Sequence, residues 1–322
     1  MKKIIGIIGL GKMGSNLGMN ALEKGYEVVG FDKYLKNDDN KTGINIKSNL
    51  SELVLSLPSP KIIFTYIPAG KAIDQLLNEI SLLLQSEDII IDGGNSYWGD
   101  SIRRAASLRE KGIHFLDCGT SGGVSGAREG VCFMVGGDKK AVKKVSPILK
   151  DLAVVNGYIY TGSSGSGHFV KLVHNGIEFG MLQAIGEGMA LLKNFREELN
   201  ISEILGVWGH GSVIRSWLID LMKQVYDDKK SFDSVPSYIE DTGEVNWLVA
   251  DALRMEIPIP VIAQSVMQLF ASREKVHISD KAIAMMRNGF GGHPFGEDNG
   301  IKYERKFGKV SNSDQYLYEE IK

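Results

Sequence analysis

The chain has few cysteines, no long apolar run and almost no net charge. Its 322 residues include only Cys118 and Cys132, which argues against a disulfide framework and fits a reducing compartment. No stretch approaches the roughly 20 apolar residues of a membrane span. The formal net charge of -2 lacks the basic excess of a nucleic-acid-binding protein. We therefore expect a cytoplasmic protein with no membrane and no nucleic acid as partner.

Strand and helix patterns divide the chain. Apolar strand patterns alternate with helical patterns in the first part, which indicates a parallel sheet covered on both faces. The predicted strands are residues 3–9, 26–32, 61–67, 88–94, 113–119 and 131–137. After about residue 166 only helical patterns follow. We predict a doubly wound α/β (Rossmann) domain over 1–163, an all-α domain over 164–299 and a polar tail over 300–322.

A glycine-rich turn follows the first predicted strand. In "IIGLGKMGSNLG" three glycines separate a strand from a helix, where the backbone can approach a pyrophosphate. Asp32 ends the second strand, where a carboxylate binds the ribose diol and repels a 2′-phosphate, although Lys33 and Lys36 would attract one. We predict NAD as cofactor, with NADP possible. The predicted cofactor contacts are Gly9, Leu10, Gly11, Lys12, Met13, Gly14, Asp32, Ile67, Pro68 and Asn95.

A second segment carries a polar stripe on an apolar helical pattern. In "GHFVKLVHNGIEFG", residues 167–180, Lys171, His174, Asn175 and Glu178 stand at i, i+3, i+4 and i+7 and share one helix face. A solvated surface stripe is the plain alternative. Three glycines between residues 180 and 188 favour close helix packing or a ligand near the backbone instead.

The stripe contains the groups that alcohol oxidation followed by decarboxylation needs. A lysine desolvated in a pocket can act as the base for the hydroxyl proton, because burial lowers the pKa of a lysine. In its protonated form Lys171 would stabilise charge on the ketone oxygen as carbon dioxide leaves, and Glu178 would protonate the enediol. No HExxH or paired-cysteine ligand set exists, so we predict no metal.

Four motifs of the chain form one recognisable set: "GLGKMGSNLG", "DGGNSYW", "GTSGGVSGAREG" and "GSGHFVKLVHNGIEFG". Together they resemble the 6-phosphogluconate dehydrogenases, in particular the short bacterial form within the β-hydroxyacid dehydrogenase superfamily. The resemblance implies NAD(P)-dependent oxidative decarboxylation of 6-phosphogluconate, a small sugar acid, to ribulose 5-phosphate and carbon dioxide. It also implies a homodimer in which the C-terminal tail completes the site of the neighbouring subunit; a tetramer is left open.

The resemblance assigns roles to individual residues. Lys171 matches the general base of the family and Glu178 its general acid. The implied substrate-binding residues are Asn95, Ser121, Gly122, Gly123, His174, Asn175, Arg287 and His293. By the same resemblance, the last two come from the neighbouring subunit.

The departures from the family pattern gather at the substrate phosphate. Phe179, Asn246, Leu248 and Leu269 stand where the family has phosphate ligands. Charge-assisted hydrogen bonds to phosphate are each worth about 1.5 to 3 kcal/mol, so losing several weakens phosphate binding strongly. The sequence therefore predicts 6-phosphogluconate or a close aldonate analogue as substrate.

Two other functions stay open at this point. One is a β-hydroxyacid dehydrogenase that stops at the carbonyl product without decarboxylation. The other is a non-catalytic sensor that binds the dinucleotide. Glu178 argues against the first, since an acid for the enediol is needed chiefly when carbon dioxide leaves.

Overall fold

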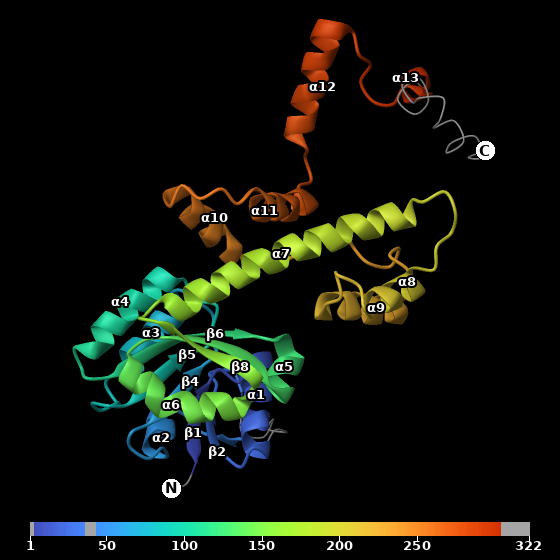
Figure 1. Ribbon diagram of the computed structural model, residues 1–322. Coiled ribbons are helices and arrows are strands. Elements are labelled where there is room, and N and C mark those ends of the chain that lie inside the picture. Colours follow the sequence, from blue (N-terminus) through green and yellow to red (C-terminus); the bar gives the residue numbers. More distant parts are fainter. Residues whose placement is uncertain (1–2, 36–42, 304–322) are drawn as a thin grey trace. The chain divides into compact units, whose positions relative to one another are not determined.

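A computed structural model describes residues 3–35 and 43–303 (Figure 1). The chain forms two compact units. The first comprises Met1–Ile177 together with Gly243–Pro258, and the second comprises Glu178–Thr242 and Ile259–Lys322. The domain boundaries predicted at residues 163 and 299 stay predictions.

Within the described residues, eight strands form one sheet in the order β3-β2-β1-β4-β5-β6-β7-β8. The neighbouring pairs from β3 to β6 are parallel, which confirms the doubly wound arrangement. The strands are β1 (Ile4–Ile8), β2 (Glu27–Phe31), β3 (Asn45–Ile46), β4 (Ile62–Thr65), β5 (Ile89–Asp92), β6 (His114–Ser121), β7 (Val131–Gly136) and β8 (Ala153–Gly162).

The far edge of the sheet departs from the sequence prediction. Strand β7 pairs with β6 in antiparallel fashion, and β8 then pairs in parallel with β7. An apolar run shows that a strand is buried but not which way it points, so this reversal was missed. Strand β8 was also missed, because it is a half-exposed edge strand without a continuous apolar run.

Helices cover both faces of the sheet. Side chains alternate along a strand, so Ile5 and Ile7 pack with the core beneath α1, α5 and α6, while Ile8 packs with the core beneath α2, α3 and α4. These helices are α1 (Lys12–Glu23), α2 (Leu50–Leu55), α3 (Lys71–Ile80), α4 (Trp98–Arg109), α5 (Gly123–Glu129) and α6 (Lys139–Leu152). The two cores hold the sheet between two layers of helices.

The remaining described elements are all helices, as predicted. They are α7 (Ser166–Lys193), α8 (Ile201–Trp208), α9 (Trp217–Lys229), α10 (Glu244–Arg254), α11 (Pro260–Arg273), α12 (Ile278–Gly291) and α13 (Asn299–Tyr303). A small core in the second unit gathers Met189, Ile201, Leu205 and Ile219. Helix α10 belongs to the first unit. No helix in the described part of the chain is both long and apolar enough to span a bilayer.

The glycines of α7 do not pack as the sequence suggested. A methyl group on Gly180 would lie 3.4 Å from Cγ1 of Val261, an ordinary contact at close range. Methyl groups on Gly186 and Gly188 would meet nothing within 4 Å among the described residues. Of the two predicted explanations, close packing is therefore wrong at these two glycines within the single chain, and a ligand near the backbone stays a prediction. Of the predicted tail, residues 304–322 lie outside the described residues.

Candidate active site

Most of the predicted site residues lie at the carboxyl-terminal end of the sheet. Strands β1, β2, β4, β5 and β6 are parallel, so the segments that follow their carboxyl ends meet there. The residues brought there are the Gly9–Gly14 turn, Asp32, Ile67, Pro68, Asn95, Ser121, Gly122 and Gly123. A methyl group on Gly9 would lie 2.8 Å from Cγ2 of Ile67, which shows how closely these segments approach.

The glycine turn fits a dinucleotide pyrophosphate. Gly14 packs so tightly that a Cβ there would lie 1.9 Å from the carbonyl oxygen of Gly9, so this helix start tolerates no side chain. A Cβ on Gly11 would meet nothing within 4 Å, which leaves open space beside the turn. The first turn of α1, including Lys12 and Met13, offers its backbone N–H groups there.

Asp32 lies against the same turn. Its Oδ2 accepts a hydrogen bond from the Leu10 N–H at 2.7 Å, and its Oδ1 accepts one from the Tyr34 N–H at 2.8 Å. The carboxylate is therefore held where a ribose diol is expected. The Lys33 ammonium lies 6.0 Å from the centre of the Tyr34 ring, and Lys36 lies outside the described residues.

Helix α7 rests directly on β6 at Lys171. A Cβ on Gly119 would lie 2.4 Å from the Lys171 Cβ and 2.9 Å from the Gly167 carbonyl oxygen, so glycine is required for this approach. The buried Asp117 carboxylate accepts hydrogen bonds from the N–H groups of Gly165 and His168, at 2.8 and 3.0 Å. Asp117 thus satisfies donors at the start of α7 and anchors that helix end to the sheet.

His168 forms a second anchor beneath Lys171. Only 2% of the residue is exposed, its Nε2 lies 3.0 Å from the Asp92 carbonyl oxygen, and its Nδ1 lies 2.7 Å from the Ser101 hydroxyl. The carbonyl can only accept, so Nε2 donates to it, and Nδ1 shares a hydrogen bond with the Ser101 hydroxyl. His168 therefore ties α7 to β5 and α4. The predicted motif contained His168, but no role was assigned to it.

Three side chains of the polar stripe contact one another, and one of them, His174, contacts Ser121. Lys171, which is 8% exposed, places Nζ 3.3 Å from His174 Nδ1, and His174 Nε2 lies 3.0 Å from the Ser121 hydroxyl. His174 Nδ1 also lies 3.3 Å from Asn175 Oδ1. A protonated lysine can donate to His174 Nδ1, whereas a protonated Nδ1 can donate to Asn175. His174 therefore lies between Lys171 and Ser121 and contacts both.

Glu244, an acid that the sequence interpretation missed, contacts the side-chain amides of Asn95 and Asn175. Oε1 of Glu244 accepts from Asn95 Nδ2 at 3.4 Å and from Asn175 Nδ2 at 3.5 Å. Glu244 is the first residue of α10, and nothing near it in the sequence marks it as a partner of residues this far away. The recess here encloses about 10 Å³ and is lined by Asn95, Ser96, His168, Lys171, Leu172, Asn175, Glu244 and Trp247.

The other predicted residues lie in two places. Gly122 and Gly123 begin α5 with φ of 121° and 63°, immediately after Ser121. Glu178, Phe179, Leu269, Arg287 and His293 belong to the second unit. There Arg287 Nη2 lies 3.4 Å from His293 Nδ1, and both residues are exposed or half-buried. Their contact with substrate stays a prediction.

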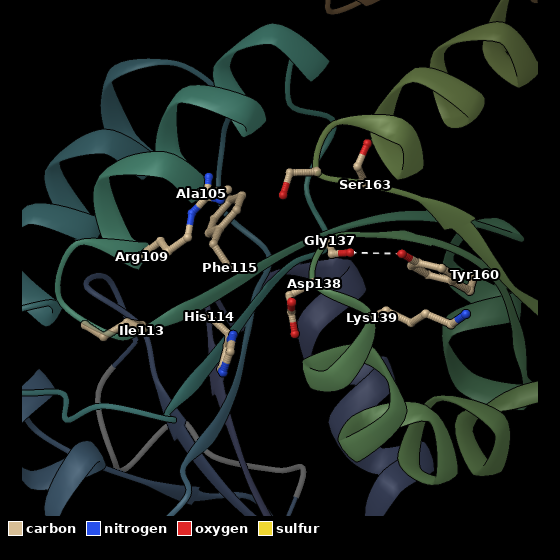
Figure 2. A pocket seen from close by; sticks show the side chains of 11 residues that line it. Ala105, Arg109, Ile113, His114, Phe115, Gly137, Asp138, Lys139, Tyr160 and Ser163 are labelled. Carbon is tan, nitrogen blue, oxygen red and sulfur yellow. Dashed lines mark hydrogen bonds between the residues drawn. The ribbon is translucent and has the colours of Figure 1, made fainter.

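A larger cavity of about 350 Å³ lies elsewhere in the first unit (Figure 2). It opens beside His114, at the amino end of β6, whereas Ser121 ends that strand. The Tyr160 hydroxyl donates to the Gly137 carbonyl oxygen on one wall, and Asp138 caps α6 beside it. None of the predicted site residues lines this cavity, so it is not the candidate active site.

Two family models cover most of the chain. The model described as the NAD binding domain of 6-phosphogluconate dehydrogenase matches residues 4–162. The model described as the 6-phosphogluconate dehydrogenase C-terminal domain matches residues 167–298. The first match includes the glycine turn and Asp32, and the second includes the whole polar stripe.

Individual proteins similar to this chain are also named as 6-phosphogluconate dehydrogenases. A Bacillus subtilis protein, YqeC, provisionally named a 6-phosphogluconate dehydrogenase, is 44% identical over 291 residues, covering 90% of this chain and 98% of that protein. An NAD(+)-dependent, decarboxylating 6-phosphogluconate dehydrogenase of Haloferax volcanii is 37% identical, with 90% and 97% covered. The solved 6-phosphogluconate dehydrogenase of Plasmodium falciparum, studied with NADP+ and with 6-phosphogluconate, matches at a TM-score of 0.76 and 28% identity, covering 94% of this chain and 68% of that one.

Proposed function

This chain belongs to the 6-phosphogluconate dehydrogenase family, and we propose that it catalyses NAD(P)-dependent oxidative decarboxylation of 6-phosphogluconate or a close aldonate analogue. The observation that carries the proposal is the arrangement around Lys171. A nearly buried lysine at the foot of α7 lies beside His174, and His174 lies beside Ser121 at the sheet edge where a dinucleotide fits.

The residues divide the reaction between them. Neutral Lys171 takes the hydroxyl proton of the substrate. The glycine turn and Asp32 would hold NAD(P), which when bound would supply the hydride acceptor for this oxidation. Protonated Lys171 then holds the charge that develops on the new ketone oxygen as the carbon–carbon bond to the carboxylate breaks. The electron pair of that bond forms an enediol as Lys171 passes its proton to the oxygen, and carbon dioxide leaves. Glu178 then donates a proton to the carbon while the enediol hydroxyl returns its proton to Lys171, which completes the ketose.

Two positions of α10 bear on the phosphate of the substrate. Leu248 is 7% exposed and belongs to the apolar face of α10, so it offers no hydrogen bond to a phosphate. Asn246 is exposed and carries no charge. We propose 6-phosphogluconate as the first candidate substrate, because the relatives are named as 6-phosphogluconate dehydrogenases. An unphosphorylated aldonate is the second candidate.

We propose NAD as the preferred cofactor. The Asp32 carboxylate is fixed by two backbone N–H groups at the end of β2, so it cannot easily turn away from a ribose bound there. A 2′-phosphate in the same place would meet this negative charge. The Haloferax volcanii relative is named for NAD(+), whereas the Plasmodium falciparum enzyme was solved with NADP+.

We further propose a homodimer. Of the residues described, none in α12 is buried, although the helix carries large apolar side chains. Those exposed by half or more are Ile278, Ile283, Met285, Met286 and Phe290. A helix of this composition is stable when another surface covers it, and a second copy of this chain would also bring Arg287 and His293 to a neighbouring site.

A cytoplasmic location is consistent with two free thiols, Cys118 and Cys132.

The test follows reduced nicotinamide with NAD and, separately, with NADP. 6-Phosphogluconate and gluconate are offered in parallel, and released carbon dioxide is trapped. Equal amounts of reduced cofactor and carbon dioxide are expected from at least one of the two acids. Reduced cofactor without carbon dioxide would support a non-decarboxylating dehydrogenase, and NAD binding without turnover of either acid would support a sensor.

A further inference from the structure

Glu244 lies in the recess that also contains Lys171. Its Oε1 accepts from the side-chain amides of both Asn95 and Asn175, at 3.4 and 3.5 Å. Both distances lie at the long limit for N–H···O hydrogen bonds, so these bonds are weak.

Helix α10 is anchored to the start of α4 within the first unit. The buried Asp251 carboxylate accepts from the Tyr97 hydroxyl at 3.0 Å and from Trp98 Nε1 at 2.6 Å. The Trp247 ring lies 5.6 Å from the Tyr97 ring. Burial and the neighbouring Asp251 carboxylate raise the pKa of Tyr97, so its phenol remains a donor at neutral pH. These contacts fix the start of α10, and with it Glu244, beside the loop that carries Asn95.

The hydrogen-bond donors and acceptors of Glu244, Asn95 and Asn175 favour one kind of ligand group. A carboxylate can only accept, whereas the two amide nitrogens can only donate. A ligand atom inserted between them must therefore donate to Glu244 and accept from Asn95 or Asn175. A sugar hydroxyl does both. A phosphate or carboxylate oxygen has no proton to donate at neutral pH and would also be repelled by the charge.

We propose that Glu244 is a specificity-determining residue that accepts a hydrogen bond from a hydroxyl on the carbon chain of the sugar acid. The inference rests on the proposed function and names the group recognised there. The recess of about 10 Å³ holds about one water molecule, so the incoming hydroxyl takes the place of the weak amide–carboxylate contacts as the side chains separate.

The test compares Glu244→Gln with the wild-type enzyme, using NAD with 6-phosphogluconate and with gluconate. Glutamine keeps the size but loses the charge and one acceptor. We expect KM for a sugar acid to rise about 10-fold or more, as for loss of a charge-assisted hydrogen bond. We expect kcat to change less than about threefold and KM for NAD to stay constant. The rise should be the same for both acids, since both carry the hydroxyl chain.

Two further variants sharpen the result. Glu244→Asp should recover part of the affinity, because the carboxylate remains but is shorter by one methylene. Glu256→Gln removes the same charge from the exposed end of the same segment and should match wild type. With an aldonate that lacks the recognised hydroxyl, wild type and Glu244→Gln should have equal KM.

The outcomes separate this inference from the proposed function. A wild-type enzyme that turns over neither acid overturns the proposed function. An active wild type whose Glu244→Gln variant has unchanged KM overturns the role of Glu244. A loss of kcat with unchanged KM would mean that Glu244 acts on the chemistry, and a lower KM for 6-phosphogluconate alone would mean that it faces the phosphate; either result also overturns the role.

Discussion

Replacing Gly119 by alanine should move Lys171, the proposed catalytic base. The new Cβ would lie 2.4 Å from the Lys171 Cβ and 2.9 Å from the Gly167 carbonyl oxygen. The first distance is about 1 Å shorter than the roughly 3.5 Å of ordinary carbon–carbon contact. Neither atom can rotate away, because one is a backbone oxygen and the other is bonded to the backbone. Helix α7 must therefore shift by about 1 Å at its start.

That displacement predicts two measurable effects. Overpacking of this size costs about 1 to 3 kcal/mol of stability, which lowers Tm by several degrees for a domain of this length. A misplacement of about 1 Å at a reacting group can cost about 10²-fold in rate, so kcat should fall by that order. The dissociation constant for NAD should stay unchanged, since the glycine turn and Asp32 lie on other strands.

The matched control is Gly188→Ala, in the same helix. A methyl group there meets nothing within 4 Å among the described residues, and alanine favours helix over glycine by up to about 1 kcal/mol. This variant should keep wild-type kcat and equal or higher Tm. Calorimetric melting, NAD titration and initial rates on both variants complete the experiment. A Gly119→Ala enzyme with wild-type kcat would refute the reasoning, because Lys171 would then tolerate the displacement.

The remaining predictions concern charge. Lys171→Met and Glu178→Gln should each lower kcat by about 10² to 10⁴ while NAD binding persists, and a substrate deuterated at the oxidised carbon should slow the Lys171 variant but not the Glu178 variant. Wild-type rates in either would show that the stripe is structural. Asp32→Asn should shift the kcat/KM ratio towards NADP at least about 10-fold, and an unchanged ratio would remove Asp32 from cofactor selection. The Ala141 backbone N–H lowers the pKa of Asp138, which caps α6, so Asp138→Ala should cost about 1 kcal/mol at pH 7. The cap contributes fully above the unfolded pKa of about 3.9 and is lost as pH falls through the lower folded pKa, so the two proteins should converge in urea unfolding at low pH; a constant gap would contradict this.

Local patterns made much of the first unit predictable. A glycine turn between strand and helix, an acid at the end of the next strand and apolar runs of strand length all act over a few residues. The same holds for the stripe on α7, which needs only the helical period. The structure brings Lys171, His174 and Asn175 together with Ser121, 53 residues from His174 in the sequence, because parallel strands end at a common edge.

Long-range polar contacts were not predictable in this way. Glu244 lies 69 residues from Asn175 and 149 from Asn95, and "TGEVNW" alone is typical of an ordinary helix start. The antiparallel direction of β7 was missed for a related reason, since direction depends on how the chain returns. Asp117 did leave a signal: an acid inside the apolar run "IHFLDCG" must find donors if the strand is buried.

Lys171 and Glu244 are positioned by different elements of the first unit. Asp117 and His168 fix the start of α7, and both are almost fully buried, so changing either would leave unpaired polar groups in the core. Glu244 is only half-buried and stands at the first position of α10, where replacement leaves the Asp251 anchor intact. The position of Lys171 is therefore costly to alter, whereas Glu244, the proposed contact to the sugar chain, can change at little cost in stability. On this reasoning, we expect the departures from the family pattern at Asn246 and Leu248 to alter which acid binds and not which reaction follows.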